Sequence, residues 1–598
     1  MAARFFDLRG SFEHAPRTLR LVFRSSRSGT LGILALTAVS ALVPIAIAYA
    51  GKRIVDAVVA HDSSLTVRFV VVELALVAAL AFASQGLSLI RQVVGARLGL
   101  DINVAILEKA TALELRQFED SEFYDKLTKA RREASQRPLS VVTRSFQMAQ
   151  NLVTLLGYAA LLVRFSGWAV GALLLAAIPA TVAEVRFSSK AFRLRNWRSP
   201  EARRLMYLEY VLANDEHAKE VKLFGLGPLF LGRYRALGET FYGEDRAIAV
   251  QRARWAYLLS LVATLTFYGC YAAMAIAAAR GLLTLGDMTL DMVAFRQGQQ
   301  AFQSLLGAFG GMYEDNLYMS NLFEFLDIEV ARPKPLAGDD ARAIVEGESG
   351  VRFDDVGFRY PGRDEWALRN VSVFIPRGES LALVGQNGAG KTTFIKLLTR
   401  LYEPTEGRVL LDGKDLRAWD EQALRRRMAV VFQDFAQYQL SAGENVGVGS
   451  VEALQDAPQI DRAIKRGGAE EVISGLKGGL STNLGRWFKD GVELSGGQWQ
   501  KVALARAFMR EGADILVLDE PTAALDAEAE HAVFERFRDL TRGKTSILIS
   551  HRFPTVRMAD RILVIEHGHV IEEGTHQELL AKAGRYAQLF TLQASGYV

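Results

Sequence analysis

Long apolar runs alternate with basic stretches in the first half of the chain. The run Leu31 to Ala50 contains no charged residue, and a second apolar run, Phe69 to Ile90, follows it closely. Because about 20 apolar residues cross the hydrocarbon core of a bilayer, each run predicts a membrane-spanning helix. We expect six such helices in all, the other four being Leu152 to Val163, Trp168 to Val185, Tyr257 to Ala279 and Met288 to Met312.

Basic residues mark which ends of these helices face the cytoplasm, since short cytoplasmic loops retain lysine and arginine. Arg17, Arg20, Arg24 and Arg27 precede the first run, and further basic clusters follow the second and fourth runs. We therefore expect a multi-pass protein of the bacterial inner membrane with both termini in the cytoplasm. A signal peptide cleaved after Ala50 is the alternative, but a second span follows soon after, as expected for a retained helix.

The last of the six spans carries a polar stripe. At about 100° per residue, its polar positions fall on one side of a helix, away from Phe302 and Phe309. They are Arg296, Gln299, Gln300, Gln303, Gly307 and Glu314. The stripe is explained either by helix packing and cytoplasmic exposure or by the wall of a central cavity. Under the second hypothesis Arg296 and Gln300 touch a substrate in that cavity, and Arg296 favours an anionic one.

The pattern changes near Glu329. Pro333 and Pro335 interrupt the helical pattern, and short β-branched runs then alternate with helical segments, as is typical of an α/β domain. We expect a transmembrane domain over 1–328, a linker over 329–347 and an α/β domain over 348–598. Such a chain is multidomain, with an all-α membrane part of six spanning helices ahead of an α/β part.

A glycine-rich loop follows the strand pattern Ser380 to Val384 and leads into a helical pattern. It matches G-x-x-x-x-G-K-[ST], in which backbone amides and the helix N-terminus hold phosphate oxygens, the lysine reaches the β and γ phosphates, and the last hydroxyl reaches Mg²⁺. The loop consists of Gly385, Gln386, Asn387, Gly388, Ala389, Gly390, Lys391 and Thr392, with Thr393 directly after it. The sequence therefore predicts that the α/β part is a P-loop NTPase domain with a site for ATP and Mg²⁺.

Two adjacent carboxylates end a second buried strand pattern. Asp519 and Glu520 follow the apolar run Ile515 to Leu518, at the strand edge where ligands gather in open parallel sheets. Asp519 is suited to the Mg²⁺ shell, and Glu520 to polarising the water that attacks the γ-phosphate. A serine–glycine turn upstream opens an amphipathic helix and is suited to binding an anion. That turn is Ser495, Gly496, Gly497 and Gln498.

Together these motifs resemble those of the ATP-binding cassette transporters, and the resemblance covers the whole chain. Further residues match the family in order: Tyr360 resembles the aromatic residue that stacks on adenine, and Gln433 the glutamine that senses Mg²⁺. Asp526 resembles the aspartate of the loop that communicates between sites, and His551 the switch histidine. The resemblance implies an exporter-type half-transporter and ATPase whose catalytic residues are Glu520, His551 and Gln433. Thr392, Gln433 and Asp519 are implied to hold Mg²⁺.

The family forms each ATP site between two cassettes, so the resemblance also implies a dimer. A homodimer would have two complete sites, and a heterodimer remains open. The other implied partners are membrane lipids and a transported amphipathic molecule, peptide or lipid of unknown identity. An importer of the same fold and a soluble ATPase are the alternatives.

Two segments depart from the family pattern. Ala523 stands where many relatives have serine, and Leu484 to Gly491 replaces an acidic, glycine-rich coupling element, which leaves Arg486 and Trp487 as candidates for the coupling contact. The segments Phe118 to Leu127 and Glu216 to Gly225 resemble the cytoplasmic turns through which exporter membrane domains contact their ATPases.

Composition narrows the remaining classes. The chain has a formal net charge of +4 spread over many acids and bases, so nothing favours binding to nucleic acid. A single cysteine, Cys270, excludes an internal disulfide framework and a cysteine-based metal cluster.

Overall fold

The computed structural model describes residues 14–120, 137–165, 199–329, 349–520 and 543–595 apart from His551, with isolated positions between these ranges. The chain divides into two units. The first comprises Met1–Leu113 and Asp120–Glu329, and the second comprises Glu114–Glu119 and Val330–Val598.

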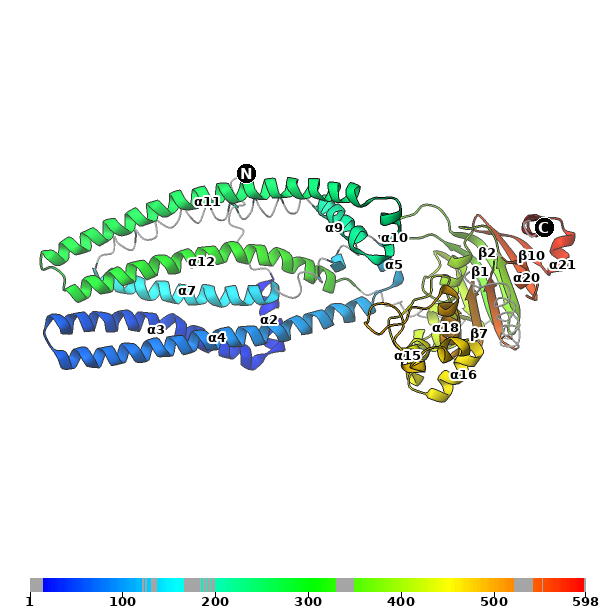
Figure 1. Cartoon of the computed structure of the whole chain (residues 1–598), viewed down its shortest axis with the longest axis horizontal. Coiled ribbons are helices and arrows are strands. Elements are labelled where there is room, and N and C mark those ends of the chain that lie inside the picture. Colours follow the sequence, from blue (N-terminus) through cyan, green and yellow to red (C-terminus); the bar gives the residue numbers. More distant parts are fainter. Residues whose placement is uncertain are drawn as a thin grey trace. The chain divides into compact units, whose positions relative to one another are not determined.

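The described part of the first unit is helical (Figure 1). Its helices are α2 (Ala15–Ser25), α3 (Arg27–Val59), α4 (Ser63–Thr111), α7 (Arg137–Phe165), α9 (Ser199–Ala213), α10 (Asp215–Leu223), α11 (Gly227–Ala279) and α12 (Leu285–Leu326). Side-chain caps set where several of them begin. Ser26 accepts from the backbone of Gly29 at the start of α3, Asp62 from Leu65 at the start of α4, and Thr284 from Asp287 at the start of α12.

Four helices of this unit are long and apolar enough to cross a membrane, over Arg27–Val59, Ser63–Thr111, Pro138–Val163 and Gly227–Ala279. These stretches contain four of the six spans expected from the sequence. The expected span Trp168 to Val185 lies outside the described residues. Met288 to Met312 lies within the continuous helix α12, which is not among the four because Arg296 and the glutamines after it lower its hydropathy.

Close helix packing orders this unit. α3 packs along α4, and α12 packs along α7 and against α3. A Cβ at Gly32 would lie 3.0 Å from the Cδ1 of Ile90, and one at Gly86 would lie 3.1 Å from the Cδ1 of Leu36, so glycine allows α3 and α4 to approach. The outer surface of α4 remains apolar, with Phe82 exposed to 76%. A surface of this kind is stable in contact with lipid chains and unfavourable in water.

The second unit holds two sheets. The antiparallel sheet has the order β2-β1-β4-β5, and the six-stranded sheet has the order β10-β9-β3-β8-β7-β6. The strands are β1 (Gly350–Phe358), β2 (Leu368–Pro376), β3 (Ser380–Val384), β4 (Glu406–Leu411), β5 (Lys414–Asp415), β6 (Met428–Val431), β7 (Ile515–Asp519), β8 (Thr545–Ile549), β9 (Arg561–Glu566) and β10 (His569–Gly574).

Helices pack around these sheets. They are α5 (Leu115–Phe118), α13 (Lys391–Leu398), α14 (Glu421–Arg426), α15 (Ala442–Gly447), α16 (Ala457–Gly467), α17 (Glu470–Ser474), α18 (Gly496–Phe508), α20 (Phe553–Val556), α21 (His576–Ala581) and α22 (Arg585–Ser595). β3, β6, β7, β8 and β9 run parallel to one another, and only β10 pairs antiparallel in this sheet. The carboxyl ends of β3 and β7 therefore face the same edge of the sheet, where both sequence motifs of the nucleotide site follow.

Candidate nucleotide site

The glycine-rich loop leaves β3, a central strand between β8 and β9. Gly388 and Gly390 have φ of +80° and +109°, a region that disfavours other residues. A Cβ at Gly385 would lie 2.2 Å from the carbonyl oxygen of Ile565. Glycine at these positions allows the loop to curl tightly into α13, whose N-terminus is suited to holding a phosphate group.

Lys391 turns back over this loop. Its ammonium group donates to the carbonyl oxygens of Gly385 at 2.8 Å and Gln386 at 2.9 Å, and the residue is only 6% exposed. Burial lowers its pKa, while the carboxylates of Glu520 and Asp519 act in the opposite direction. The cation therefore lies over the loop, within the electrostatic influence of the two carboxylates at the end of β7.

Asp519 is a buried carboxylate beside the hydroxyl that ends the loop. It is 2% exposed, and Thr392 donates from Oγ1 to Asp519 Oδ2 over 3.3 Å. Burial raises the pKa of Asp519 to about 6, although the hydrogen bond from Thr392 opposes the shift. An ionised carboxylate in this position is destabilised until a cation approaches it.

Glu520 and Gln433 come together from different strands. Gln433 follows β6 and donates from Nε2 to Glu520 Oε2 over 2.8 Å. Glu520 has φ of +50°, which is strained for a residue with a side chain. Its backbone is held by two hydrogen bonds, from its own amide to Ile549 and from Gln500 Nε2 to its carbonyl oxygen. The strained backbone turns the side chain of Glu520 away from the strand, toward Gln433.

Tyr360 lies beside the helix that follows the loop. Its hydroxyl is 3.0 Å from Thr393 Oγ1, and its ring packs edge-on against Phe358 and Tyr402. These contacts fix the ring near α13.

Ser495 caps α18 through reciprocal hydrogen bonds with Gln498: the Ser495 amide donates to Gln498 Oε1 and the Gln498 amide donates to Ser495 Oγ. Arg506 anchors the helix by donating to the carbonyl oxygens of Asn445 and Ala436. In the part of the chain that the structure describes, no hydrogen bond joins the Ser495 turn to the glycine-rich loop.

The segment Glu114–Glu119 belongs to the second unit although it precedes it by more than 200 residues in the chain. The resemblance of Phe118 to Leu127 to a coupling turn predicts a contact with an ATPase domain here, but sequence reasoning did not predict which side chains make it. Leu115 packs against the core of that unit. Glu119 accepts from Lys396 Nζ at 3.0 Å and from the hydroxyl of Tyr402 at 2.5 Å, and these two hydrogen bonds lower its pKa against the effect of burial. Lys396 also lies 5.3 Å from the ring centre of Tyr360. The segment thus contacts the surroundings of the predicted adenine site.

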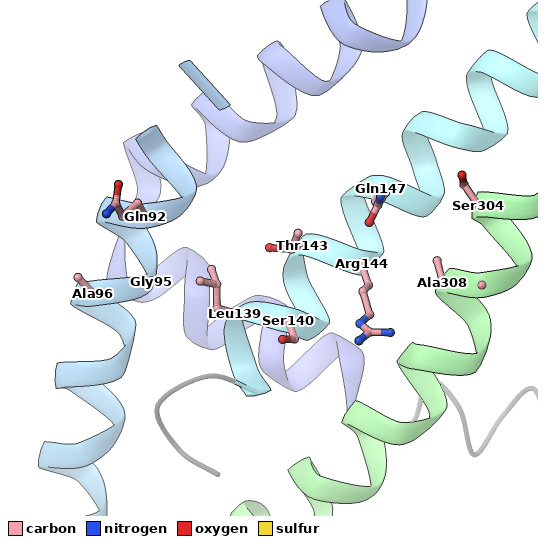
Figure 2. Close-up of a pocket in the computed structure, with 11 residues that line it drawn as sticks. Gln92, Gly95, Ala96, Leu139, Ser140, Thr143, Arg144, Gln147, Ser304 and Ala308 are labelled. Carbon is pink, nitrogen blue, oxygen red and sulfur yellow. The ribbon is translucent and has the colours of Figure 1, made fainter. Parts of the chain in front are cut away.

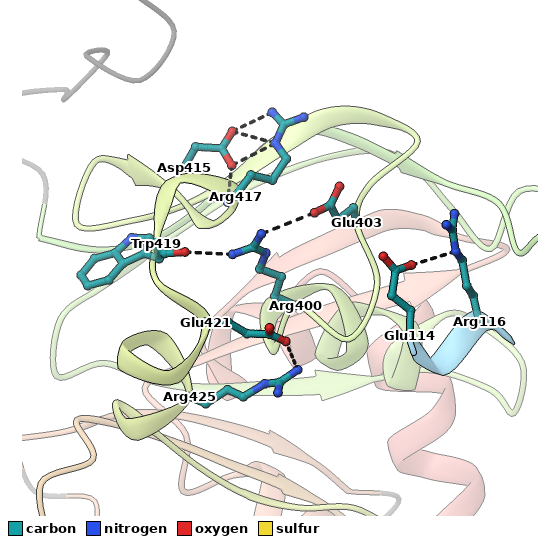
Figure 3. Close-up of polar contacts among 9 residues, drawn as sticks. All are labelled: Glu114, Arg116, Arg400, Glu403, Asp415, Arg417, Trp419, Glu421 and Arg425. Carbon is teal, nitrogen blue, oxygen red and sulfur yellow. Dashed lines mark hydrogen bonds and ion pairs between the residues drawn. The ribbon is translucent and has the colours of Figure 1, made fainter. Parts of the chain in front are cut away.

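The chain around Tyr402 is fixed by polar contacts (Figure 3). Arg400 donates from Nη1 to the carbonyl oxygen of Trp419 at 3.0 Å and pairs with Glu403 at 3.7 Å. Arg417 and Asp415 form a further pair at 2.7 Å, and Arg116 pairs with Glu114 at 2.7 Å.

Several site residues predicted from the sequence lie away from this site or outside the residues that the structure describes. Ala523, Asp526 and His551 lie outside the described residues. Trp487, in the segment that departs from the family, is 83% exposed, and Arg486 pairs with Glu493 at 3.4 Å. In the polar stripe of α12, Arg296, Gln300 and Gln303 are exposed, whereas Gln299 is partly buried. The structure therefore assembles the loop, Asp519, Glu520, Gln433 and Tyr360 on one unit and leaves the stripe as a separate surface.

Comparisons with known proteins agree with this arrangement. Residues 368–523 match the protein family described as ABC transporter. The chain is 31% identical over 587 residues to the subtilin transport ATP-binding protein SpaT of Bacillus subtilis, covering 96% of this chain and 93% of that protein. It is 28% identical over 582 residues to the nisin transport ATP-binding protein NisT of Lactococcus lactis subsp. lactis, covering 96% and 95%.

Two further similarities extend beyond the nucleotide site. The ATP-dependent lipid A-core flippase of Escherichia coli (strain K12) is 32% identical over 432 residues, which is 72% of each chain. A solved structure of a bacterial Atm1-family ABC exporter with ATP bound superposes with a TM-score of 0.74 at 26% identity, covering 95% of this chain and 98% of that chain. The similarity to that exporter thus includes the helical unit as well as the nucleotide-binding unit.

Proposed function

The chain belongs to the ATP-binding cassette transporters of the exporter type, and on that premise we propose that two copies of it bind ATP between them and export an amphipathic compound. The chain is a multi-pass membrane protein whose ATP hydrolysis drives transport, and the comparisons do not favour an importer. We further propose that residues 1–328 form the membrane domain, residues 329–347 the linker and residues 348–598 the ATP-binding cassette.

The observation that carries this proposal is the convergence of Thr392, Asp519 and the Glu520–Gln433 pair at the carboxyl edge of one sheet. In this arrangement Glu520 orients and polarises the attacking water, and Gln433 holds the carboxylate of Glu520 in position. Lys391 is placed to bind the β and γ phosphates once the nucleotide displaces its contacts with the loop carbonyls. We propose that His551 contacts the γ-phosphate and that Asp526 links the two sites, as in the family.

We propose Mg²⁺ as the metal cofactor, with Thr392, Asp519 and Gln433 as its protein ligands. The donor set fits, because hydroxyl, carboxylate and amide oxygens are the ligands that Mg²⁺ prefers. The raised pKa of the buried Asp519 also indicates that a cation is needed to stabilise its ionised form. When bound, the ion neutralises the charge that develops on the phosphate oxygens.

This assignment predicts a pH dependence. Because the pKa of Asp519 is raised to about 6, the carboxylate is largely protonated below that pH and largely ionised above it. The apparent affinity for Mg²⁺ at saturating ATP should therefore fall as pH decreases through about 6, approaching tenfold per pH unit well below it. Titrations of ATPase rate against Mg²⁺ from pH 5 to pH 8 measure this. Asp519→Asn should bind Mg²⁺ weakly at every pH, and a wild-type affinity that is flat across the range would contradict the assignment.

A homodimer is our proposal for the assembly. The chain carries one P-loop and one Ser495 turn, so two copies would complete two equivalent sites, while a different half-transporter as partner would serve equally well chemically. We place the protein in the bacterial inner membrane with both termini cytoplasmic, because arginines cluster before α3 and basic residues follow α4. Membrane lipids would then cover the exposed apolar faces of α4 and α11.

The polar stripe of α12 is proposed as part of the transport pathway, with Arg296, Gln299, Gln300 and Gln303 facing it. An exposed arginine is costly in contact with lipid, so a polar surrounding is required. Arg296→Ala and Gln300→Ala should weaken the stimulation of ATPase by substrate while leaving basal ATPase intact. Unchanged stimulation in both variants would return the stripe to a packing role.

A further inference from the structure

A cavity of about 800 Å³ opens between α4, α7 and α12 within the first unit (Figure 2). Its described lining combines small and apolar residues with several polar side chains and includes no carboxylate side chain. The polar lining residues are Gln92, Ser140, Thr143, Arg144, Gln147 and Ser304. Gly307 and Ala308 of α12 complete one side, so the cavity continues the polar stripe that begins at Arg296. A cavity of this size accommodates a small ligand or the head of a larger one.

Among the lining residues that the structure describes, Arg144 is the one with a charged side chain. It extends from α7 toward α12 (Figure 2), where its Nε lies 2.8 Å from Asp315 Oδ2. Asp315 is fully buried, whereas the Arg144 side chain is 32% exposed. Asp315 therefore forms an ion pair with the Nε side of the guanidinium, and Arg144 contributes its exposed part to the cavity lining.

Gly311 fixes the same guanidinium from a second direction. A Cβ at this position would lie 0.9 Å from Nη1 of Arg144 and 2.2 Å from Cζ. The guanidinium thus rests directly against the backbone of α12, in space that exists only because residue 311 is glycine. A donor held in place before binding loses less entropy when a ligand arrives.

The remaining donors of Arg144 determine what the cavity accepts. In the described part of the chain, neither Nη group has a hydrogen-bond partner, so each retains N–H groups for a ligand. A carboxylate matches two guanidinium N–H groups in a forked arrangement. Because Asp315 already balances the arginine charge, a carboxylate leaves one excess negative charge in the cavity, whereas a doubly charged phosphate leaves two. The charge balance therefore favours a single carboxylate over a phosphate.

We propose that this cavity binds a carboxylate group of the transported compound, with Arg144 as its direct contact and Gly311 and Asp315 as positioning residues. The neutral amides and hydroxyls around Arg144 pair with the polar groups next to that carboxylate. The inference rests on the proposed function, because it names the class of compound that the exporter carries.

The test uses a matched pair of probes on the full-length protein in nanodiscs: N-octanoylglutamine, which has a free carboxylate, and its α-amide, which lacks the charge. Octyl phosphate serves as the third probe, and protein-free nanodiscs correct for partition into lipid. Binding is measured by equilibrium dialysis, and ATPase rate is measured on the same samples. Wild-type protein should bind the acid about tenfold more tightly than the amide and more tightly than octyl phosphate.

Two variants test whether the preference for the acid over the amide depends on Arg144. Arg144→Gln should bind the acid and the amide equally. Gly311→Ala keeps every charge but places a methyl group where the guanidinium lies, so it should also raise the Kd for the acid severalfold without changing that for the amide. Gly269→Ala is the matched control, since a Cβ there meets nothing within 4 Å and the residue lies on α11, outside the cavity.

Three results would overturn the inference: equal binding of acid and amide by wild-type protein, no binding of either, or tighter binding of octyl phosphate. A preference for the acid that survives in Gly311→Ala would also contradict it, and this variant remains decisive if Arg144→Gln does not fold. An absence of ATPase activity in the wild-type sample would instead count against the proposed function. A failure of the carboxylate proposal can therefore be distinguished from a failure of the proposed function.

Discussion

Glu520→Gln should lower the ATPase turnover number by about 10² or more while ATP binding persists. The glutamine side chain occupies the same volume and can still contact Gln433, but it cannot accept a proton from, or strongly polarise, the attacking water. Asp519, Thr392 and Lys391 are untouched by the change, so the phosphates and Mg²⁺ should be held as before. Nucleotide should therefore be retained on the variant for longer than on wild-type protein.

ATPase rates and retention of labelled ATP after rapid gel filtration measure both halves of this prediction. Glu452→Gln is the control, because it makes the same chemical change at a side chain that is 77% exposed and pairs only with Arg426 at 3.5 Å. Near-normal turnover in Glu520→Gln, or loss of turnover in Glu452→Gln, would remove the catalytic assignment from Glu520.

Mixed dimers should regain activity that both parent variants lack. Lys391→Ala breaks every P-loop in its own homodimer, and Ser495→Arg breaks every turn that would close over the nucleotide. If each site takes its P-loop from one chain and its Ser495 turn from the other, a dimer of the two variants contains one intact site and one doubly broken site. Its ATPase rate should then approach half that of the wild type if one site can act alone.

Covalently linked pairs of the two variants avoid statistical mixing, and linked pairs of each variant with itself provide the background. A mixed pair no more active than those backgrounds would show either that sites do not form between chains or that one site cannot turn over alone. A linked pair of wild type with the doubly substituted chain separates these two cases, because both of its sites are broken under the shared arrangement and one remains intact under the alternative.

The nucleotide site could be predicted from the sequence because its determinants are local. A β-branched run followed by glycines and a lysine specifies strand, loop and helix within a short stretch, and an apolar run ending in Asp519 and Glu520 specifies the second strand end. The parallel sheet then brings both ends to one edge. Gln433 was predicted only through the family resemblance, and its hydrogen bond with Glu520 joins residues 87 positions apart.

The contacts that the sequence did not predict are those between distant segments. The resemblance of Phe118 to Leu127 to a coupling turn predicts a contact near Glu119, but its hydrogen bonds with Lys396 and Tyr402 depend on how residues more than 270 positions apart fold together. Nothing in the sequence distinguishes Gly311 from an ordinary helical glycine, because its contact with the guanidinium of Arg144 exists only in the folded structure. Met288 to Met312 was the least apolar of the six predicted spans. In the structure it is part of the continuous helix α12, on which Arg296, Gln300 and Gln303 are exposed.

Direction and energy source together form the central claim, and uptake into inside-out membrane vesicles tests both. Mass spectrometry of compounds that copurify with Glu520→Gln protein supplies the compound to follow. In inside-out vesicles the cassettes face the medium, so added ATP should drive that compound into the lumen with wild-type protein and leave it outside with Glu520→Gln. ATP-driven loss of a preloaded compound from the lumen, or equal uptake by the wild type and Glu520→Gln, would contradict the account.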